Sequence, residues 1–187
     1  EAQAGARDLL AAAPLDGAAI EAFWRRLDDD YFLRHGPDEI AWHTRLVLEA
    51  PADRDYLVEL RAETGKGGTE IFLYTPAQPN LFTRISAALD QLGLTVADAR
   101  IITSRDQYAL DSYLVMESSG EPVLAEDRTG EIVEVLEHIL RTPSPTRPRV
   151  SRRQPRQFRH FETATQVDFA TDATGGRTIV ELVTSDR

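Results

Sequence analysis

The spacing of hydrophobic residues predicts helices over the first fifty positions. Apolar side chains recur at intervals of three and four in two runs: Leu9, Leu10 and Ala13, then Ile20, Phe23, Trp24 and Leu27. Such spacing is typical of amphipathic helices with one buried stripe. A further helix is expected from Gly36 and Pro37 to just before Pro51, because proline is tolerated in the first helical turn. These helices hold too few apolar residues for a core of their own, so we expect residues 1–50 to be the end of a larger upstream helical domain.

From Pro51 onward the pattern changes from helical to extended. Branched and aromatic residues fill two segments separated by TGKGG, whose glycines suit a hairpin turn. Asn80 is positioned to cap the next helix and Gly93 to end it. The predicted elements are strands at 55–63 and 69–76, a helix at 80–93, strands at 94–104 and 108–117, and a helix at about 125–141.

This order of elements predicts an α+β fold in which one antiparallel sheet carries both helices on a single face. In the common βαββαβ arrangement the last strand lies beside the first. Here the strand at 55–63 can take that edge by hairpin pairing with the strand at 69–76. We therefore predict a permuted ferredoxin-like domain over residues 51–142.

The last part of the chain combines a linker with an internal repeat. Prolines and arginines predict an irregular connection over 143–164. Residues 165–187 are again strand, glycine turn and strand, and TIVELVTSDR (178–187) aligns without gaps on TEIFLYTPAQ (69–78). The repeat indicates the first hairpin of a second, truncated copy of the domain. We expect its exposed strands to pair with a sheet edge of the first copy or of another chain.

Composition narrows the classes of function. Residues 1–137 carry 12 basic and 26 acidic side chains, whereas residues 138–187 carry 9 arginines and 5 acids. The Arg-rich segment allows nucleic-acid contact, but it lacks an interleaved aromatic platform, and a solvated linker is the better interpretation. With no cysteine in the chain, disulfides and thiolate metal sites are excluded, and no apolar run reaches the roughly 18 residues of a membrane helix. We expect a cytoplasmic protein without nucleic-acid or membrane partners.

Three groups of polar residues invite a catalytic or metal-site interpretation. His35 and His43 lie near several acids, but their spacing fits no standard ligand motif, and paired structural histidines are favoured. The GKGG run at 65–68 lacks the Ser or Thr and the following helix of a phosphate loop, and is interpreted as a turn. Three acids near the turn between the last two strands have no partner base, which argues against general acid–base catalysis: Asp106, Asp111 and Glu117.

Three runs of sequence carry a resemblance to a known family. They are YFLRHGPDEIAWHT (31–44), TEIFLYTPAQPNLFTRISAALDQLGLTVADARIITSRDQYALDSYLV (69–115) and RRQPRQFRHF (152–161). Together they resemble the C-terminal region of the bacterial bifunctional uridylyltransferase and uridylyl-removing enzymes, which act on the PII nitrogen-regulatory protein. The resemblance implies the end of an HD-type domain at 1–50, a first ACT domain at 51–142 and the start of a second at 165–187.

The resemblance implies regulation rather than catalysis by these residues. In the family the full enzyme attaches UMP to PII when glutamine is scarce and removes it when glutamine is plentiful, and the tandem ACT domains sense glutamine. The sequence holds neither the Gly-Ser motif with paired aspartates nor the His-Asp metal site that these activities need. No cofactor is therefore expected here, and magnesium is expected for the parent enzyme. The alternative is an interaction module that binds no ligand and serves to dimerise or to dock PII.

The resemblance also implies a ligand site. It places an amino acid between the loop after the first ACT strand and the start of the second sheet strand of a paired ACT domain. A helix N-terminus suits the ligand carboxylate and an aspartate suits its ammonium group. Ala77 and Asn80 stand where the family has aspartate and glycine, although Asn80 adopts positive φ readily, and the second copy keeps the acid. The implied ligand-binding residues are Ala77, Gln78, Asn80, Leu81, Val96, Asp98 and Asp186.

Overall fold

A computed structural model describes residues 2–51, 53–62, 65–144, 164–172 and 177–183. The chain divides into two compact units, Glu1–Pro148 and Arg149–Arg187. The elements of the first unit are α1 (Ala2–Leu10), α2 (Gly17–Trp24), α3 (Asp29–Arg34), α4 (Pro37–Glu49), β1 (Leu57–Arg61), β2 (Thr69–Pro76), α5 (Leu81–Gln91), β3 (Thr95–Thr103), β4 (Tyr108–Met116) and α6 (Glu126–Arg141). The second unit contains β5 (Gln166–Asp172) and β6 (Arg177–Val183).

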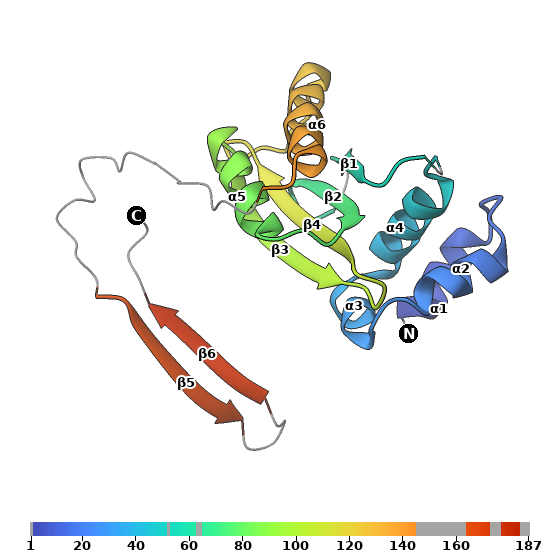
Figure 1. Ribbon diagram of the computed structural model, residues 1–187, viewed down its shortest axis with the longest axis horizontal. Helices are drawn as coiled ribbons and strands as arrows, with labels where there is room; N and C mark the ends of the chain where they lie inside the picture. The colour runs from blue at the N-terminus through green and yellow to red at the C-terminus, as the bar shows by residue number, and fades with distance from the viewer. Residues whose placement is uncertain (1, 52, 63–64, 145–163, 173–176, 184–187) are drawn as a thin grey trace. The chain divides into compact units, whose positions relative to one another are not determined.

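The first unit is built on a four-stranded antiparallel sheet with the strand order β1-β2-β4-β3. β1 pairs with β2 as a hairpin, with Leu57 opposite Tyr74 and Arg61 opposite Glu70. Gly65 and Gly67 in the intervening turn have φ of 64° and 77°, a region that glycine enters without steric cost. α5 and α6 lie on one side of this sheet (Figure 1). The predicted α+β, permuted ferredoxin-like fold is confirmed, and β1 takes the edge that the last strand has in the common arrangement.

The central strands β2 and β4 are buried on both faces, because α1–α4 cover the side opposite α5 and α6 (Figure 1). Alternate residues of β2 point to opposite faces. Ile71 and Leu73 therefore join the core beneath α5 and α6, whereas Phe72 joins the core beneath the N-terminal helices. Burial on both sides accounts for the unbroken apolar run IFLY in β2. The helices α1–α4 thus complete their core on the sheet, and the assignment of residues 1–50 to an upstream domain stays a prediction.

Within this helical layer, α4 begins at Pro37 as the sequence predicts. The backbone N–H of Gly36 donates to Glu39 Oε2 at 2.7 Å, which fixes the entry of the chain into the helix. The short helix α3 was not predicted. With only six residues it is too short to produce a periodic hydrophobic signal.

In the second unit, β5 and β6 form an antiparallel hairpin with Gln166 opposite Val183 and Asp172 opposite Arg177. This is the hairpin that the repeat predicts. Its Phe169 side chain is exposed, and its pairing with a sheet edge stays a prediction. Most of the predicted linker lies outside the described residues. None of the helices in the described ranges is both long and apolar enough to cross a lipid bilayer.

Candidate functional site

The loop between β2 and α5 has the backbone shape predicted for a ligand loop. The N–H of Ala77 donates to the carbonyl oxygen of Gln107 at 2.8 Å, which ties the start of the loop to the β3–β4 turn. Asn80 has φ 56° and ψ 23°, so the predicted positive φ is confirmed. Its side chain does not make the expected capping hydrogen bond. The left-handed residue turns the chain directly into α5, and the first N–H groups of the helix lie beside the loop.

Two of the predicted ligand-binding side chains are engaged in packing. Leu81 is buried in the core beneath α5 and α6. Gln78 Nε2 donates to the carbonyl oxygen of Leu140 at 2.9 Å, and Gln78 Oε1 accepts from Arg84 at 3.0 Å. The structure thus gives both residues a structural contact, and their contact with a ligand stays a prediction.

Arg84 is the side chain that joins this loop to the end of α6. Only 8% of the residue is exposed, and its guanidinium donates to the carbonyl oxygens of Ile139 and Thr142. Burial lowers the pKa of Arg84 from its ordinary value. The last carbonyls of a helix have no partner within the helix. Arg84 and Gln78 supply those partners, so the loop and the C-terminus of α6 form one hydrogen-bonded assembly.

The remaining predicted residues, Val96 and Asp98, lie at the other end of the sheet. Thr69 and Val96 are both opposite Val115 of β4, so β2 and β3 run parallel from the same end. The loop after β2 is therefore level with the end of β3. At about 3.3 Å per residue, seven residues of β3 separate Val96 from Thr103 by roughly 23 Å. The two halves of the predicted site do not meet within one domain, and Asp186 lies outside the described residues.

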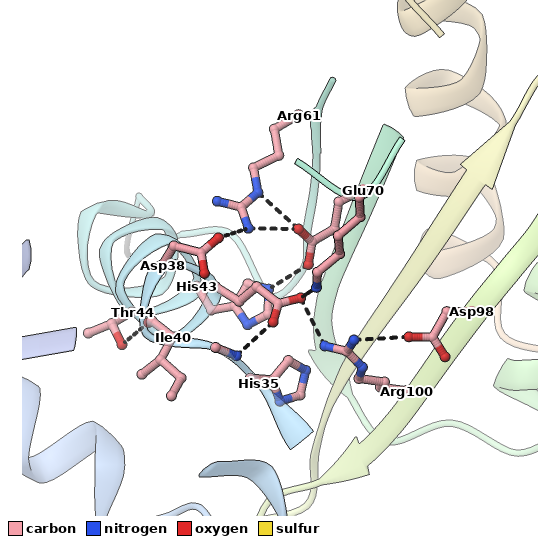
Figure 2. A network of polar contacts seen from close by, with 12 residues as sticks. His35, Asp38, Ile40, His43, Thr44, Arg61, Glu70, Asp98 and Arg100 are labelled. Atoms are coloured by element: carbon pink, nitrogen blue, oxygen red, sulfur yellow. Dashed lines mark hydrogen bonds and ion pairs between the residues drawn. The ribbon is translucent and has the colours of Figure 1, made fainter. Parts of the chain in front are cut away.

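A second group of candidate residues joins α4 to the sheet (Figure 2). We call it the interlayer network. Its charged members carry four carboxylates and three cationic groups, and His43 lies among them. The charged members are Asp38, Glu39, Arg61, Lys66, Glu70, Asp98 and Arg100.

Glu39 is the acid of the interlayer network that accepts hydrogen bonds from the most residues. Its side chain is 3% exposed and accepts hydrogen bonds from the Gly36 N–H, from Lys66 and from Arg100 Nη1, the last at 2.8 Å. Arg100 Nη2 also contacts Asp98 Oδ2 at 3.0 Å. Burial alone would raise the pKa of Glu39, but the hydrogen bonds from Lys66 and Gly36 hold it below its ordinary value. Glu39 is therefore an ionised carboxylate neutralised by two cations.

Glu70 and His43 form the second part of the interlayer network. Arg61 Nε donates to Glu70 Oε2 at 2.9 Å, and Arg61 Nη2 donates to Asp38 at 3.1 Å. His43 Nε2 lies 3.6 Å from Glu70 Oε1, beyond hydrogen-bond length, and His43 Nδ1 is 2.9 Å from the Tyr31 hydroxyl. Burial lowers the pKa of His43 to about 4, so the ring is neutral near pH 7. Since a carboxylate cannot donate, the proton belongs on Nε2 and Tyr31 donates to Nδ1.

His43 is a buried structural histidine, as predicted; it is hydrogen-bonded to Tyr31, and the acid that its Nε2 faces is Glu70. The rest of the interlayer network was not predicted from sequence, because the sheet was expected to bury only one face. The signal that could have revealed it is the run TEIFLY, where an acid adjoins apolar residues that are buried on both sides of β2. Such an acid needs a cationic partner from a covering layer.

The three acids considered near the β3–β4 turn have different surroundings. Asp106 pairs with Arg26 Nε at 2.5 Å, and Glu117 pairs with Arg128 Nε at 3.0 Å. Asp111 lies in the middle of β4, on the face beneath α5, and is 1% exposed. Among the described residues, neither of its carboxylate oxygens has a hydrogen-bond partner. Burial raises the pKa of Asp111 to about 7.

Comparison with known proteins gives a consistent result. Residues 1–46 match the family model described as the fifth domain of uridylyltransferase GlnD. A bifunctional uridylyltransferase/uridylyl-removing enzyme of Pseudomonas fluorescens (strain SBW25) is 41% identical over 189 residues, which is 99% of this chain and 21% of that protein. Enzymes of the same description from Pseudomonas syringae pv. tomato and Pseudomonas fluorescens Pf-5 are each 40% identical, over 99% and 100% of this chain and 21% of theirs. The chain spans about a fifth of the length of these relatives.

Proposed function

The chain belongs by sequence to the C-terminal region of the bifunctional uridylyltransferase/uridylyl-removing enzymes, and from this relationship we propose that it is their regulatory, glutamine-sensing ACT region. It carries no catalytic step itself. Its role is to bind an amino-acid effector and to pass that state to catalytic domains elsewhere in the parent enzyme. In that enzyme the effector governs transfer of UMP to the PII protein and its removal.

The observation that carries the proposal is the loop between β2 and α5. It ends in a left-handed residue, Asn80, and leads directly into the N-terminus of an 11-residue helix. The N–H groups and the dipole at such an end suit a carboxylate ligand. Ala77 supplies no charge for the ligand's ammonium group, so that contact has to come from another element.

The parallel course of β2 and β3 supports a site made by two ACT copies. β3 is an edge strand, and Val96 and Ile101 on it are 40% and 41% exposed. If a second copy pairs with this edge in antiparallel fashion, the loop of one copy comes level with Val96 and Asp98 of the other. The second copy is either the repeat that begins at 165 or the same domain of another chain.

The magnesium expected for the parent enzyme does not fit the residues described here. A magnesium site needs carboxylates that are not already neutralised. Glu39 and Glu70, the buried acids of the interlayer network, are each paired with arginine or lysine. No cluster of three or more potential metal ligands occurs in the described ranges.

The contacts of Gln78 and Leu81 favour a second candidate function, that of an interaction module. Both side chains are engaged inside the domain, and Ala77 lacks the acid. These features suit a first copy that binds no ligand and serves to dimerise or to dock PII.

Titration calorimetry with glutamine separates the two functions. It would use this chain and a chain extended through the complete second repeat. The sensing function predicts heat of binding with both proteins, and an Asn80→Pro variant of each protein, which cannot adopt positive φ at position 80, should lose at least part of it. Binding by the extended chain alone, undiminished by Asn80→Pro, would assign sensing to the second copy and leave the first as an interaction module.

A further inference from the structure

The interlayer network joins two parts of the chain that have different places in the proposed function. On one side lies α4, most of which falls within the residues matched by the GlnD fifth-domain model. On the other side lies β3, whose first residues belong to the predicted ligand site. Arg100 contacts both sides through one guanidinium group: Nη1 contacts Glu39 and Nη2 contacts Asp98.

We propose that Arg100 is a relay that couples the start of β3 to the N-terminus of α4. The identity of the signal that acts on β3 rests on the proposed function. The coupling itself rests on contacts within this chain.

Exposure along the relay runs from solvent to interior. The Asp98 side chain is 48% exposed, that of Arg100 is 20% exposed and that of Glu39 is 3% exposed. The pairing of β3 with β4 is irregular between Val96 and Asp98, so this end of the edge strand departs from a regular ladder. A ligand cation or a newly paired strand can therefore reach Asp98, whereas it cannot reach Glu39. Any competition for Asp98 changes how the Arg100 guanidinium is shared between the two acids.

The change reaches α4 because Glu39 also fixes the first turn of that helix. Glu39 Oε2 accepts from the Gly36 N–H at 2.7 Å, and the Ile40 N–H donates to the Gly36 carbonyl at 3.0 Å. One turn later the ring of His43 stacks on Phe72 of β2, with centroids 3.9 Å apart and planes at 11°. The middle of α4 is thus held on the sheet, and its N-terminal turn is the part that responds.

Lys66 provides Glu39 with a second cationic partner besides Arg100. Its ammonium group also contacts Glu39, so the buried carboxylate keeps one cation when Arg100 shifts toward Asp98. The relay can therefore alternate between two arrangements without leaving a buried charge unpaired, which would be costly.

The test is Asp98→Asn in the 187-residue chain, read without any ligand by hydrogen–deuterium exchange of the amides in the range 36–40, where Pro37 has no N–H. We expect about fivefold slower exchange at the start of α4, because Arg100 is then left to Glu39; this is the size of a weak allosteric coupling. Asp98→Glu, which keeps a carboxylate at this position, should exchange these amides at the wild-type rate. Arg100→Lys should keep the fold but speed exchange at the same amides, because a single ammonium cannot hold two acids in the way a planar fork does.

Asp28→Asn is the matched control. Asp28 forms an exposed ion pair with Arg105 at 2.8 Å that also joins the helical layer to the sheet, but it does not touch Glu39. This variant should leave exchange at 36–40 unchanged. Exchange altered only within β3, or altered equally by Asp28→Asn, would overturn the relay. An effect of Asp98→Asn in a protein that fails to bind glutamine would uphold the relay while refuting the proposed effector.

Discussion

The isolated carboxyl group of Asp111 makes a sharp prediction about stability. Asp111 is buried in β4, and its oxygens have no hydrogen-bond partner among the described residues. The backbone N–H of Ile102 offsets part of the burial effect without meeting hydrogen-bond geometry to either oxygen, and the pKa rises from 3.8 to about 7. Replacing the carboxyl by an amide in Asp111→Asn removes the titration and keeps the shape.

The sign follows from the raised pKa. Because the folded pKa is above the unfolded one, the unfolded chain loses its proton first as pH rises. The wild type therefore loses stability between about pH 4 and pH 7, and the loss is complete above pH 7. A difference of about 3 pKa units corresponds to about 4 kcal/mol at pH 8, of which only about 1.5 kcal/mol has developed at pH 5.

The buried amide of Asp111→Asn carries its own cost of about 1–3 kcal/mol, but this cost does not depend on pH. The decisive quantity is thus how the difference in unfolding free energy between variant and wild type changes with pH. It should favour the variant by about 2.5 kcal/mol more at pH 8 than at pH 5. Asp111→Leu should show the same pH dependence without the amide cost.

Urea denaturation at pH 5, 6, 7 and 8, followed by circular dichroism and tryptophan fluorescence, measures these differences. Asp55→Asn, an exposed acid in the same unit, provides the control and should differ from wild type by a constant amount. A constant difference for Asp111→Asn across this range would show that the carboxyl group is not isolated, and would refute the reasoning.

Three further predictions concern other parts of the first unit. Because the pKa of His43 is lowered to about 4, the unfolded chain takes up a proton below pH 6.5 that the folded chain does not. The wild type should therefore lose about 3 kcal/mol of stability from this group between pH 6.5 and pH 4, and His43→Gln should not show this loss. Urea denaturation at both pH values measures the difference. Arg84→Met leaves carbonyls at the end of α6 without donors and should cost about 2–4 kcal/mol in the same assay. The exposed Arg105→Met should cost less than about 1 kcal/mol, and equal losses would contradict a stabilising role of the Arg84 hydrogen bonds. At the left-handed position 80, Asn80→Ala should lose about 1 kcal/mol relative to Asn80→Gly in thermal melts, and identical melting temperatures would argue against the positive φ.

The fold of the first unit could be predicted because its signals are local. The change of hydrophobic period after Pro51, the glycines at 65–68 and the stop at Gly93 define the elements, and the element order then limits the topology. The left-handed conformation of Asn80 agrees with its residue type and with the glycine that the family has at this position, whereas the capping hydrogen bond expected from its place before a helix is not made.

The contacts that decide the site are not local. Gln78 bonds to Leu140, 62 positions away, and Arg100 bonds to Glu39, 61 positions away. No spacing within one segment encodes such partners. The predicted ligand-binding set takes Gln78 from one ACT copy and Asp98 from a paired copy, and within one copy the parallel course of β2 and β3 places these two residues at opposite ends of the sheet.

Burial of the sheet on both faces bears on what counts as a module in this chain. The match to the GlnD fifth-domain model ends at residue 46, yet the core beneath α1–α4 includes Leu57, Phe72 and Leu110 from the sheet. A protein cut at that boundary would present these side chains to water on one fragment and their helical cover on the other. Recombination or engineering that moves the four-stranded sheet between proteins would therefore have to move the four helices with it, and the transferable unit is larger than the region that the family model matches.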